Sequence, residues 1–145
     1  MAKGERQPAR VFLLSPANCG GIRARMMTSP RASVALARQL QDGQGAALGD
    51  VFSFVSGLYF RGKLAYARRF ARPHDPGDPV VGGGVLVITP NAGLRSADTL
   101  VTLESFHGFA RTEVDLRSAA YRTPLERSAR ALHRAVGARS EEHTS

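Results

Sequence analysis

The segment from Gly49 to Arg72, GDVFSFVSGLYFRGKLAYARRFAR, constrains the fold more than any other part of the chain. It opens with an apolar, β-branched and aromatic run and, after Ser56 and Gly57, continues with the periodicity of a helix. Apolar residues then recur at i, i+4, i+7 and i+11: Phe60, Leu64, Ala67 and Ala71. Arginines recur almost in line on an adjacent face: Arg61, Arg68 and Arg72. The segment therefore offers one face to a hydrophobic core and a second, cationic face.

The length and the cysteine content indicate one domain in a reducing compartment. A chain of 145 residues can bury a core without disulfides or a metal, and we assign residues 10–138 to a single domain. Because Cys19 is the only cysteine, no disulfide can form within the chain. The N-terminal segment is not a secretory signal, and no apolar run reaches the length of a membrane helix. We expect a cytoplasmic protein with no membrane partner, and the oligomeric state stays open.

The charge of the chain favours a polyanionic partner. The formal net charge is +8 and the pI is near 11.0. Only Lys3 and Lys63 are lysines, so eighteen of the 20 basic residues are arginines. Such a balance is typical of proteins that bind DNA or a nucleotide. A bias toward arginine, alanine and glycine in a GC-rich genome explains the same composition, and both interpretations stay open.

Two segments have the pattern of buried strands. Arg10–Leu14 (RVFLL) predicts a first strand, and Val85–Thr89 (VLVIT) predicts a central strand that is covered on both faces. Leu100–Leu103 suggests a short extended piece, and Thr112–Leu116 (TEVDL) alternates as a half-buried strand does. Phe106–Ala110 fits either a helix or a strand.

Helix signals lie between and after these strands. Ile22–Met27 predicts a short helix, and Ser29-Pro30 has the form of an N-cap and first position of a helix that continues through Gln41. Thr123-Pro124-Leu125-Glu126 has capping-box spacing and predicts a last helix that ends at Gly137. Its expected apolar stripe is Leu125, Ala129, Leu132 and Val136. Together these elements predict an α/β fold with a small, Rossmann-like, mostly parallel sheet and flanking helices.

Both ends of the chain are expected to lie outside the fold. Residues 1–9 are predicted to form a disordered tail, because they are charged and polar and precede the first apolar run. Residues 139–145, RSEEHTS, can be back-translated to a sequence that looks like a sequencing-library adapter read in frame. We interpret them as an adapter-derived scar, which would place the end of the natural reading frame near Ala138.

Two strand ends carry similar polar sequences. The first expected strand ends at Ser15-Pro16 with Asn18 nearby, and the central strand ends at Thr89-Pro90 with Asn91 nearby. In open α/β sheets, ligands bind beyond the carboxyl ends of the strands. These loops are therefore candidate ligand loops.

The sequence assigns no catalytic residue and no cofactor. Cys19 follows a strand, but none of the histidines has a spacing that marks it as a base, so a buried, inert cysteine is favoured over a nucleophile. No group of His, Cys, Asp or Glu has metal-ligand spacing, and we expect no metal. The hydroxyls of Ser56 and Tyr59 beside Arg61 and Lys63 can bind phosphate, although the start of a helix also explains Ser56.

Three stretches of the chain form a recognisable set of motifs: LLSPA (residues 13–17), GDVFSFVSGLYFRGKLAYA (residues 49–67) and VITPNAGLRSAD (residues 87–98). In this order they resemble motifs of the peroxide-stress YaaA-like proteins and of a related, uncharacterised domain family of bacteria and phages. Position by position, the resemblance points to Ser15, Tyr59, Phe60, Arg61, Tyr66, Ala67, Gly93, Leu94 and Asp98. Two residues depart from the family pattern: Thr89 stands where serine is frequent, and Ala92 stands where an aromatic residue is frequent. The resemblance implies a cytoplasmic α/β protein with a link to DNA or oxidative stress.

Two functions from different classes follow. The first is a binding module for DNA or another polyanion, through Arg61, Lys63, Arg68 and Arg72. The alternative is an enzyme that acts on a nucleotide or nucleobase at the loops after the first and central strands. Its ligand-contacting residues would be Ser15, Pro16, Asn18, Tyr59, Asn91, Gly93 and Asp98.

Overall fold

The computed structural model describes residues 8–31 and 34–144, except for the side chains of residues 138–144. Within these ranges the elements are, in chain order, β1 (Phe12–Leu14), α1 (Ile22–Thr28), α2 (Ala35–Gln41), β2 (Ala46–Ala47), α3 (Leu48–Ser56), α4 (Leu58–Phe70), β3 (Val85–Thr89), β4 (Gly93–Ser96), β5 (Leu100–Val101), α5 (Leu103–Arg111) and α6 (Ala119–Thr144).

The main sheet has three strands in the order β1-β3-β4. β1 and β3 are parallel, with Leu14 beside Val87. β3 turns back through Pro90 into β4, and this antiparallel pair aligns Thr89 with Gly93. β2 and β5 form a separate antiparallel pair. The chain is therefore an α/β protein, but the expected mostly parallel, Rossmann-like sheet is not confirmed, because these sheets are small and mixed.

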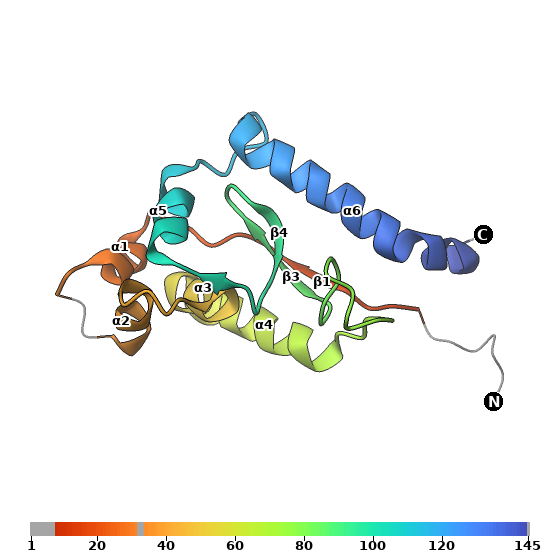
Figure 1. Cartoon of the computed structure of the whole chain (residues 1–145), viewed down its shortest axis with the longest axis horizontal. Coiled ribbons are helices and arrows are strands. Elements are labelled where there is room, and N and C mark those ends of the chain that lie inside the picture. Colours follow the sequence, from red (N-terminus) through yellow and green to blue (C-terminus); the bar gives the residue numbers. More distant parts are fainter. Residues whose placement is uncertain (1–7, 32–33, 145) are drawn as a thin grey trace.

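Helices cover both faces of the three-stranded sheet. In Figure 1, α6 lies on one side of β3 and β4, and α3 and α4 lie on the other side. The main hydrophobic core is on the side of α3 and α4, where Phe52 is fully buried. The ring of Phe52 makes edge contacts with Phe60 of α4 and Phe109 of α5, at centroid distances of 5.8 and 5.9 Å. Aromatic contacts thus join three helices beneath the sheet.

The elements with the strongest sequence patterns form where they were predicted. β3 is the central strand, and four of its five residues are buried. α4 buries Phe60, Leu64 and Ala67, as its periodicity predicted. The apolar run before it is also helical, and Gly57 separates the two helices at a φ of 79°, in the left-handed region that favours glycine. The short helix predicted at Ile22–Met27 is confirmed as α1.

The first strand is shorter and less buried than expected. Regular pairing covers Phe12–Leu14, and Leu13 is exposed. Leu13 is aligned with Leu86, whose side chain lies beneath α6. Because β1 is the edge strand and α6 packs mainly over β4 and β3, Leu13 on the outer side of β1 stays exposed.

Two local predictions in the middle of the chain are wrong. Ser29 follows α1 as its C-cap and accepts the N–H of Arg31, and α2 begins only at Ala35. Thr112–Leu116 forms no strand, because Asp115 organises a turn there. The carboxylate of Asp115 pairs with the guanidinium of Arg117 and also accepts the backbone N–H of Arg117 at 2.8 Å. The guanidinium first, and then the backbone N–H, lower the pKa of Asp115.

Other segments match in part. The extended piece expected at Leu100–Leu103 is limited to β5, and the ambiguous segment Phe106–Ala110 is helical, within α5. β4 was not predicted, and its first residue, Gly93, was instead assigned to the ligand loop after the central strand. The Pro-rich segment at residues 73–79 is a loop.

The last helix begins earlier and ends later than its sequence signals indicate. The carbonyl of Ser118 accepts the N–H groups of Tyr121 and Arg122 at 3.2 and 2.9 Å, which starts α6 before the predicted cap at Thr123. Pro124 therefore lies inside the helix, where it costs one backbone hydrogen bond. α6 also continues past Gly137. The stripe is only partly as predicted, because Leu125, Leu132 and Val136 are half-buried but Ala129 is exposed.

α6 comes closest to the sheet at Gly93. A Cβ at this position would overlap the carbonyl of Pro124 and the hydroxyl of Ser128. Gly93 also has a φ of 68°, so two independent constraints require glycine. The hydroxyl of Ser128 donates to the carbonyl of Pro124 at 2.9 Å, so the two groups that face Gly93 are hydrogen-bonded to each other.

The predictions about the chain ends are mostly untested. Residues 1–7 lie outside the described residues, and residues 8 and 9 have no regular secondary structure. α6 includes residues 139–144, and their origin as an adapter-derived scar stays a prediction. None of the helices in the described ranges combines the length and apolar character that a membrane span requires.

Candidate functional site

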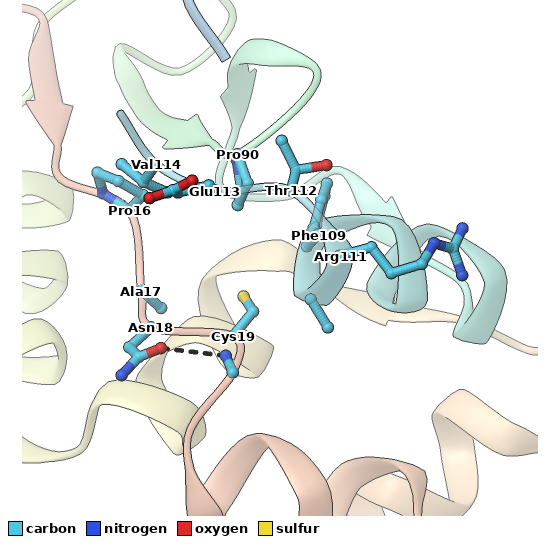
Figure 2. A pocket seen from close by; sticks show the side chains of 12 residues that line it. Pro16, Ala17, Asn18, Cys19, Pro90, Phe109, Arg111, Thr112, Glu113 and Val114 are labelled. Atoms are coloured by element: carbon cyan, nitrogen blue, oxygen red, sulfur yellow. Dashed lines mark hydrogen bonds between the residues drawn. The ribbon is translucent and has the colours of Figure 1, made fainter. Parts of the chain in front are cut away.

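A cleft of about 480 Å³ lies beyond the carboxyl ends of β1 and β3. The loop at residues 16–20, Pro90 and the segment from Phe109 to Val114 form its lining (Figure 2). β1 and β3 are neighbouring parallel strands, so the loops that follow them meet at one edge of the sheet. The two strand ends that the sequence singled out are thus neighbours in space, in the position where α/β sheets bind ligands.

The loop after β1 alternates between buried and exposed side chains. Ala17 and Cys19 belong to the main core, whereas Asn18 and Gly20 are exposed. The Oδ1 atom of Asn18 accepts the N–H of Gly20 at 3.0 Å, drawn as the dashed line in Figure 2. The two buried residues therefore anchor the loop, and the turn around Asn18 forms part of the rim of the cleft.

Cys19 lines the cleft as a protonated thiol. Its side chain is 6% exposed, and burial raises the pKa of the thiol to about 12. Nucleophilic cysteines act as thiolates, which requires a pKa near or below the ambient pH. The buried position expected for Cys19 is confirmed, and its environment favours a packing role.

The opposite wall of the cleft was not identified from the sequence. Thr102 caps α5 by accepting the N–H of Ser105 at 3.1 Å, and Phe106 and Phe109 bury the inner face of the helix. This fixes the C-terminal end of α5, with Arg111, at the rim. In Figure 2 the guanidinium of Arg111 extends away from Asn18. The sequence signal was present, because a capping threonine precedes Phe106 and Phe109, which are three residues apart.

The seven predicted ligand-loop residues are not gathered into one site. Pro16 and Asn18 line the cleft, whereas Ser15 is exposed outside its lining. Asn91 packs against α5, with its amide nitrogen 3.0 Å from the place of a Cβ on Gly108. The other members lie elsewhere: Gly93 beneath α6, Asp98 between β4 and β5, and Tyr59 on α4.

Two similar strand ends thus have different structures. Thr89 is fully buried, where its hydroxyl donates to the carbonyl of Gly93 at 2.8 Å and accepts the N–H of Ala92 at 2.9 Å. These bonds close the hairpin between β3 and β4. Ser15, the corresponding hydroxyl after β1, is exposed. The end of β3 therefore contributes Pro90 to the cleft and no free hydroxyl.

The predicted cationic residues lie on two sides of α4. Arg61 and Arg68 line a shallow groove with Asp50 and Ser53 of α3, and the Nη2 atom of Arg68 is 3.3 Å from a carboxylate oxygen of Asp98. Lys63 is on the other exposed side, with its Nζ atom 4.5 Å from the centre of the Tyr59 ring. The four groups proposed for phosphate binding, Ser56, Tyr59, Arg61 and Lys63, therefore do not form a single site.

Arg72 does not belong to the stripe on α4. The helix ends at Phe70, and Ala71 is extended. Arg72 instead pairs with Arg10 through two backbone hydrogen bonds of 2.8 and 2.9 Å. The prediction that Arg61, Arg68 and Arg72 share one helical face is therefore wrong for Arg72, whose exposed side chain follows the helix rather than lying along it.

Within the described side chains, no group of three or more His, Cys, Asp or Glu residues is arranged to hold a metal ion. Comparison with protein-family models, with curated proteins and with solved structures found no match to the chain.

Proposed function

We propose that the chain binds nucleic acid through the solvent-exposed surface of α4. The observation that carries this proposal is the charge of the helix, which has Arg61, Lys63, Arg68 and Arg69 and no carboxylate within its thirteen residues. All four are exposed. Regular arrays of phosphates recruit such surfaces by releasing condensed counterions. Arg72 adds an exposed cation directly after the helix.

The ion pairs of the molecule leave most of this charge uncompensated. Among the described side chains, Arg68 is the basic residue of α4 that pairs with a carboxylate, and Asp98 in that pair is itself well exposed. An exposed pair of this kind contributes little to stability and can open to admit a phosphate. The resemblance to YaaA-like proteins includes residues 59–67 and agrees with a role linked to DNA.

An experiment that neutralises charges on α4, with a matched control on α6, tests the proposal. The α4 variant is Arg61→Gln/Lys63→Gln/Arg69→Gln, which removes three charges and keeps helix propensity. The control is Arg127→Gln/Arg130→Gln/Arg134→Gln, which removes three charges from exposed positions of α6. Binding of a labelled 20-mer duplex is measured by fluorescence anisotropy over a range of salt concentrations.

We expect the α4 variant to bind every DNA sequence more weakly and its salt slope to fall by up to about three units. The α6 control should retain most of the affinity and most of the slope. Equal losses in both variants would mean that net charge, rather than α4, determines binding. Absence of binding by the unmodified chain at low salt would refute the proposal.

A second candidate function has its own support, which is the cleft beyond β1 and β3. The cleft lies beyond the carboxyl ends of this parallel pair, and a volume of about 480 Å³ suits a nucleotide or nucleobase. Thermal-shift titration with a nucleotide panel tests it. The expected result is a saturable rise in melting temperature that Asn18→Ala and Glu113→Gln reduce. No shift with any member of the panel would remove the candidate.

A further inference from the structure

One side of α4 exposes aromatic rings instead of packing them. Tyr59, Tyr66 and Phe70 have exposed fractions of 77%, 58% and 37%. With Lys63 they recur at i, i+4, i+7 and i+11, so all four lie within about 60° on one face of the helix. We call this set the aromatic face. It adjoins the buried side of α4 and is separate from the groove of Arg61 and Arg68.

Contacts within the aromatic face hold its rings in place. Lys63 lies over the ring of Tyr59, with Nζ 4.5 Å from the ring centre. The ring centroids of Tyr66 and Phe70 are 4.6 Å apart, and the rings of Phe12 and Tyr66 make an edge contact at a centroid distance of 5.8 Å. The guanidinium of Arg69 lies 5.6 Å from the centre of the Phe70 ring. Each ring therefore has a neighbour that limits its motion, and two of them are in contact with a cation.

The chemistry of this face indicates its occupant. A purely apolar partner would bury Lys63 and Arg69 without a counter-charge, which is costly. A duplex presents phosphates but keeps its bases stacked inside. A single strand presents phosphates for the cations and unstacked bases for the rings, which is the combination found in binders of single-stranded nucleic acid.

Resting on the proposed nucleic-acid function, we propose that the aromatic face binds single-stranded nucleic acid. Bases stack on Tyr59 and Tyr66, and the backbone phosphates contact Lys63 and Arg69. The two tyrosines are seven residues apart, about 10 Å along the helix axis at about 1.5 Å per residue. Two rings this far apart would stack on different bases of one strand.

The test compares a labelled 12-mer single strand with the duplex of the same sequence, both over the same series of salt concentrations. The variants are Tyr59→Ala, Tyr66→Ala and the pair. Tyr66→Phe keeps the ring, and Leu58→Ala is the matched control, because Leu58 is an equally exposed apolar residue of α4 outside the aromatic face. Melting temperature is recorded for each variant to establish that it is folded.

We expect each Tyr→Ala change to weaken single-strand binding by between about 5-fold and about 100-fold. The duplex should lose less, the salt slope should stay the same, and Tyr66→Phe and Leu58→Ala should bind as the unmodified chain does. Tyr59 is the decisive position, because its exposure makes a folding defect implausible.

Other outcomes separate this inference from the proposed function. If the Tyr→Ala variants bind both nucleic acids normally while Arg61→Gln/Lys63→Gln/Arg69→Gln does not, the cationic surface stands and stacking is refuted. If the unmodified chain binds neither the single strand nor the duplex, the proposed nucleic-acid function and the inference about the aromatic face are both wrong. If the chain is a dimer in sedimentation and the Tyr→Ala variants are monomers without a change in single-strand affinity, the aromatic face binds a second copy and the inference is wrong.

Discussion

α4 and α6 cover opposite faces of the same sheet, and both combine apolar residues with arginines, yet they are attached in different ways. α4 inserts Phe60, Leu64 and Ala67 into the main core. Between residues 119 and 137 of α6, only Tyr121 and Gly137 are buried, and the leucines that face the sheet are half-buried.

The space beneath α6 explains the difference. A cavity of about 260 Å³ lies between this helix and the sheet, lined by Leu86, Leu94 and Leu132 among others. The close approach is instead made at Gly93, over which the carbonyl of Pro124 and the hydroxyl of Ser128 pass. α4 is thus held by interlocking side chains, and α6 is held mainly where a glycine lets it come near. An apolar stripe predicts that a helix packs, but not how tightly.

The largest expected effect comes from placing a charge on each face of β3. Val87 is 0% exposed and belongs to the main core, so Val87→Asp should bury an unpaired carboxylate and prevent folding. Leu86 is 2% exposed but borders the cavity beneath α6, where water can solvate a charge. Leu86→Asp should therefore fold with reduced stability. Far-UV circular dichroism and solubility measure how far each variant folds. If both variants lose the same amount of folded protein, the proposed difference between the two faces of the sheet is wrong.

A smaller difference is expected when one leucine is truncated on each helix. Leu64→Ala leaves a void in a close-packed core and should cost about 3 kcal/mol of the free energy of unfolding. Leu132→Ala removes a half-buried side chain next to an existing cavity and should cost about 1 kcal/mol. Urea denaturation gives both values. If Leu132→Ala costs as much as Leu64→Ala, α6 is packed as tightly as α4.

The parts of the fold that were predicted correctly are those in which local and tertiary signals agree. In VLVIT every residue favours a buried strand, and β3 is indeed central. In α4 the period of Phe60, Leu64 and Ala67 matches the face that the core needs. Neither prediction requires knowledge of which other element packs against the segment.

The wrong predictions come from residues whose hydrogen bonds decide their structure. Asp115 looked like one position of an alternating strand, but its carboxylate binds Arg117 and makes a turn. Thr123-Pro124 looked like a helix start, but the carbonyl of Ser118 begins α6 earlier. The sequence shows which residues can donate or accept hydrogen bonds, but it does not show which of them become partners in the fold.

The candidate site shows the same limit. The meeting of the loops after β1 and β3 followed from strand parallelism alone. The wall from Phe109 to Val114 depends on how α5 packs, and the exposure of Tyr59 and Tyr66 depends on how α4 is rotated against Phe52. A local pattern can indicate that α5 is a helix, but the placement of α5 and the rotation of α4 are tertiary properties that no local pattern specifies.

The smallest expected effect isolates the contact that holds α6. Gly93→Ala puts a Cβ against the carbonyl of Pro124 at a residue with a φ of 68°. Gly82→Ala is the matched control, because Gly82 has a φ of 52° and nothing within 4 Å of its Cβ position. In Gly82→Ala the free energy of unfolding should fall by about 1 kcal/mol, from backbone strain alone.

In Gly93→Ala the free energy of unfolding should fall by about 1 kcal/mol more than in Gly82→Ala, because α6 must move away from β4. The extra loss should remain small, since the cavity beneath α6 gives the helix room to tilt and few buried side chains resist the movement. Hydrogen exchange should show faster exchange in α6 of Gly93→Ala, with α3 and α4 unchanged. Faster exchange in all three helices, or an extra loss above about 3 kcal/mol, would show that the two faces of the sheet form one cooperative core and that α6 is not the more weakly attached helix.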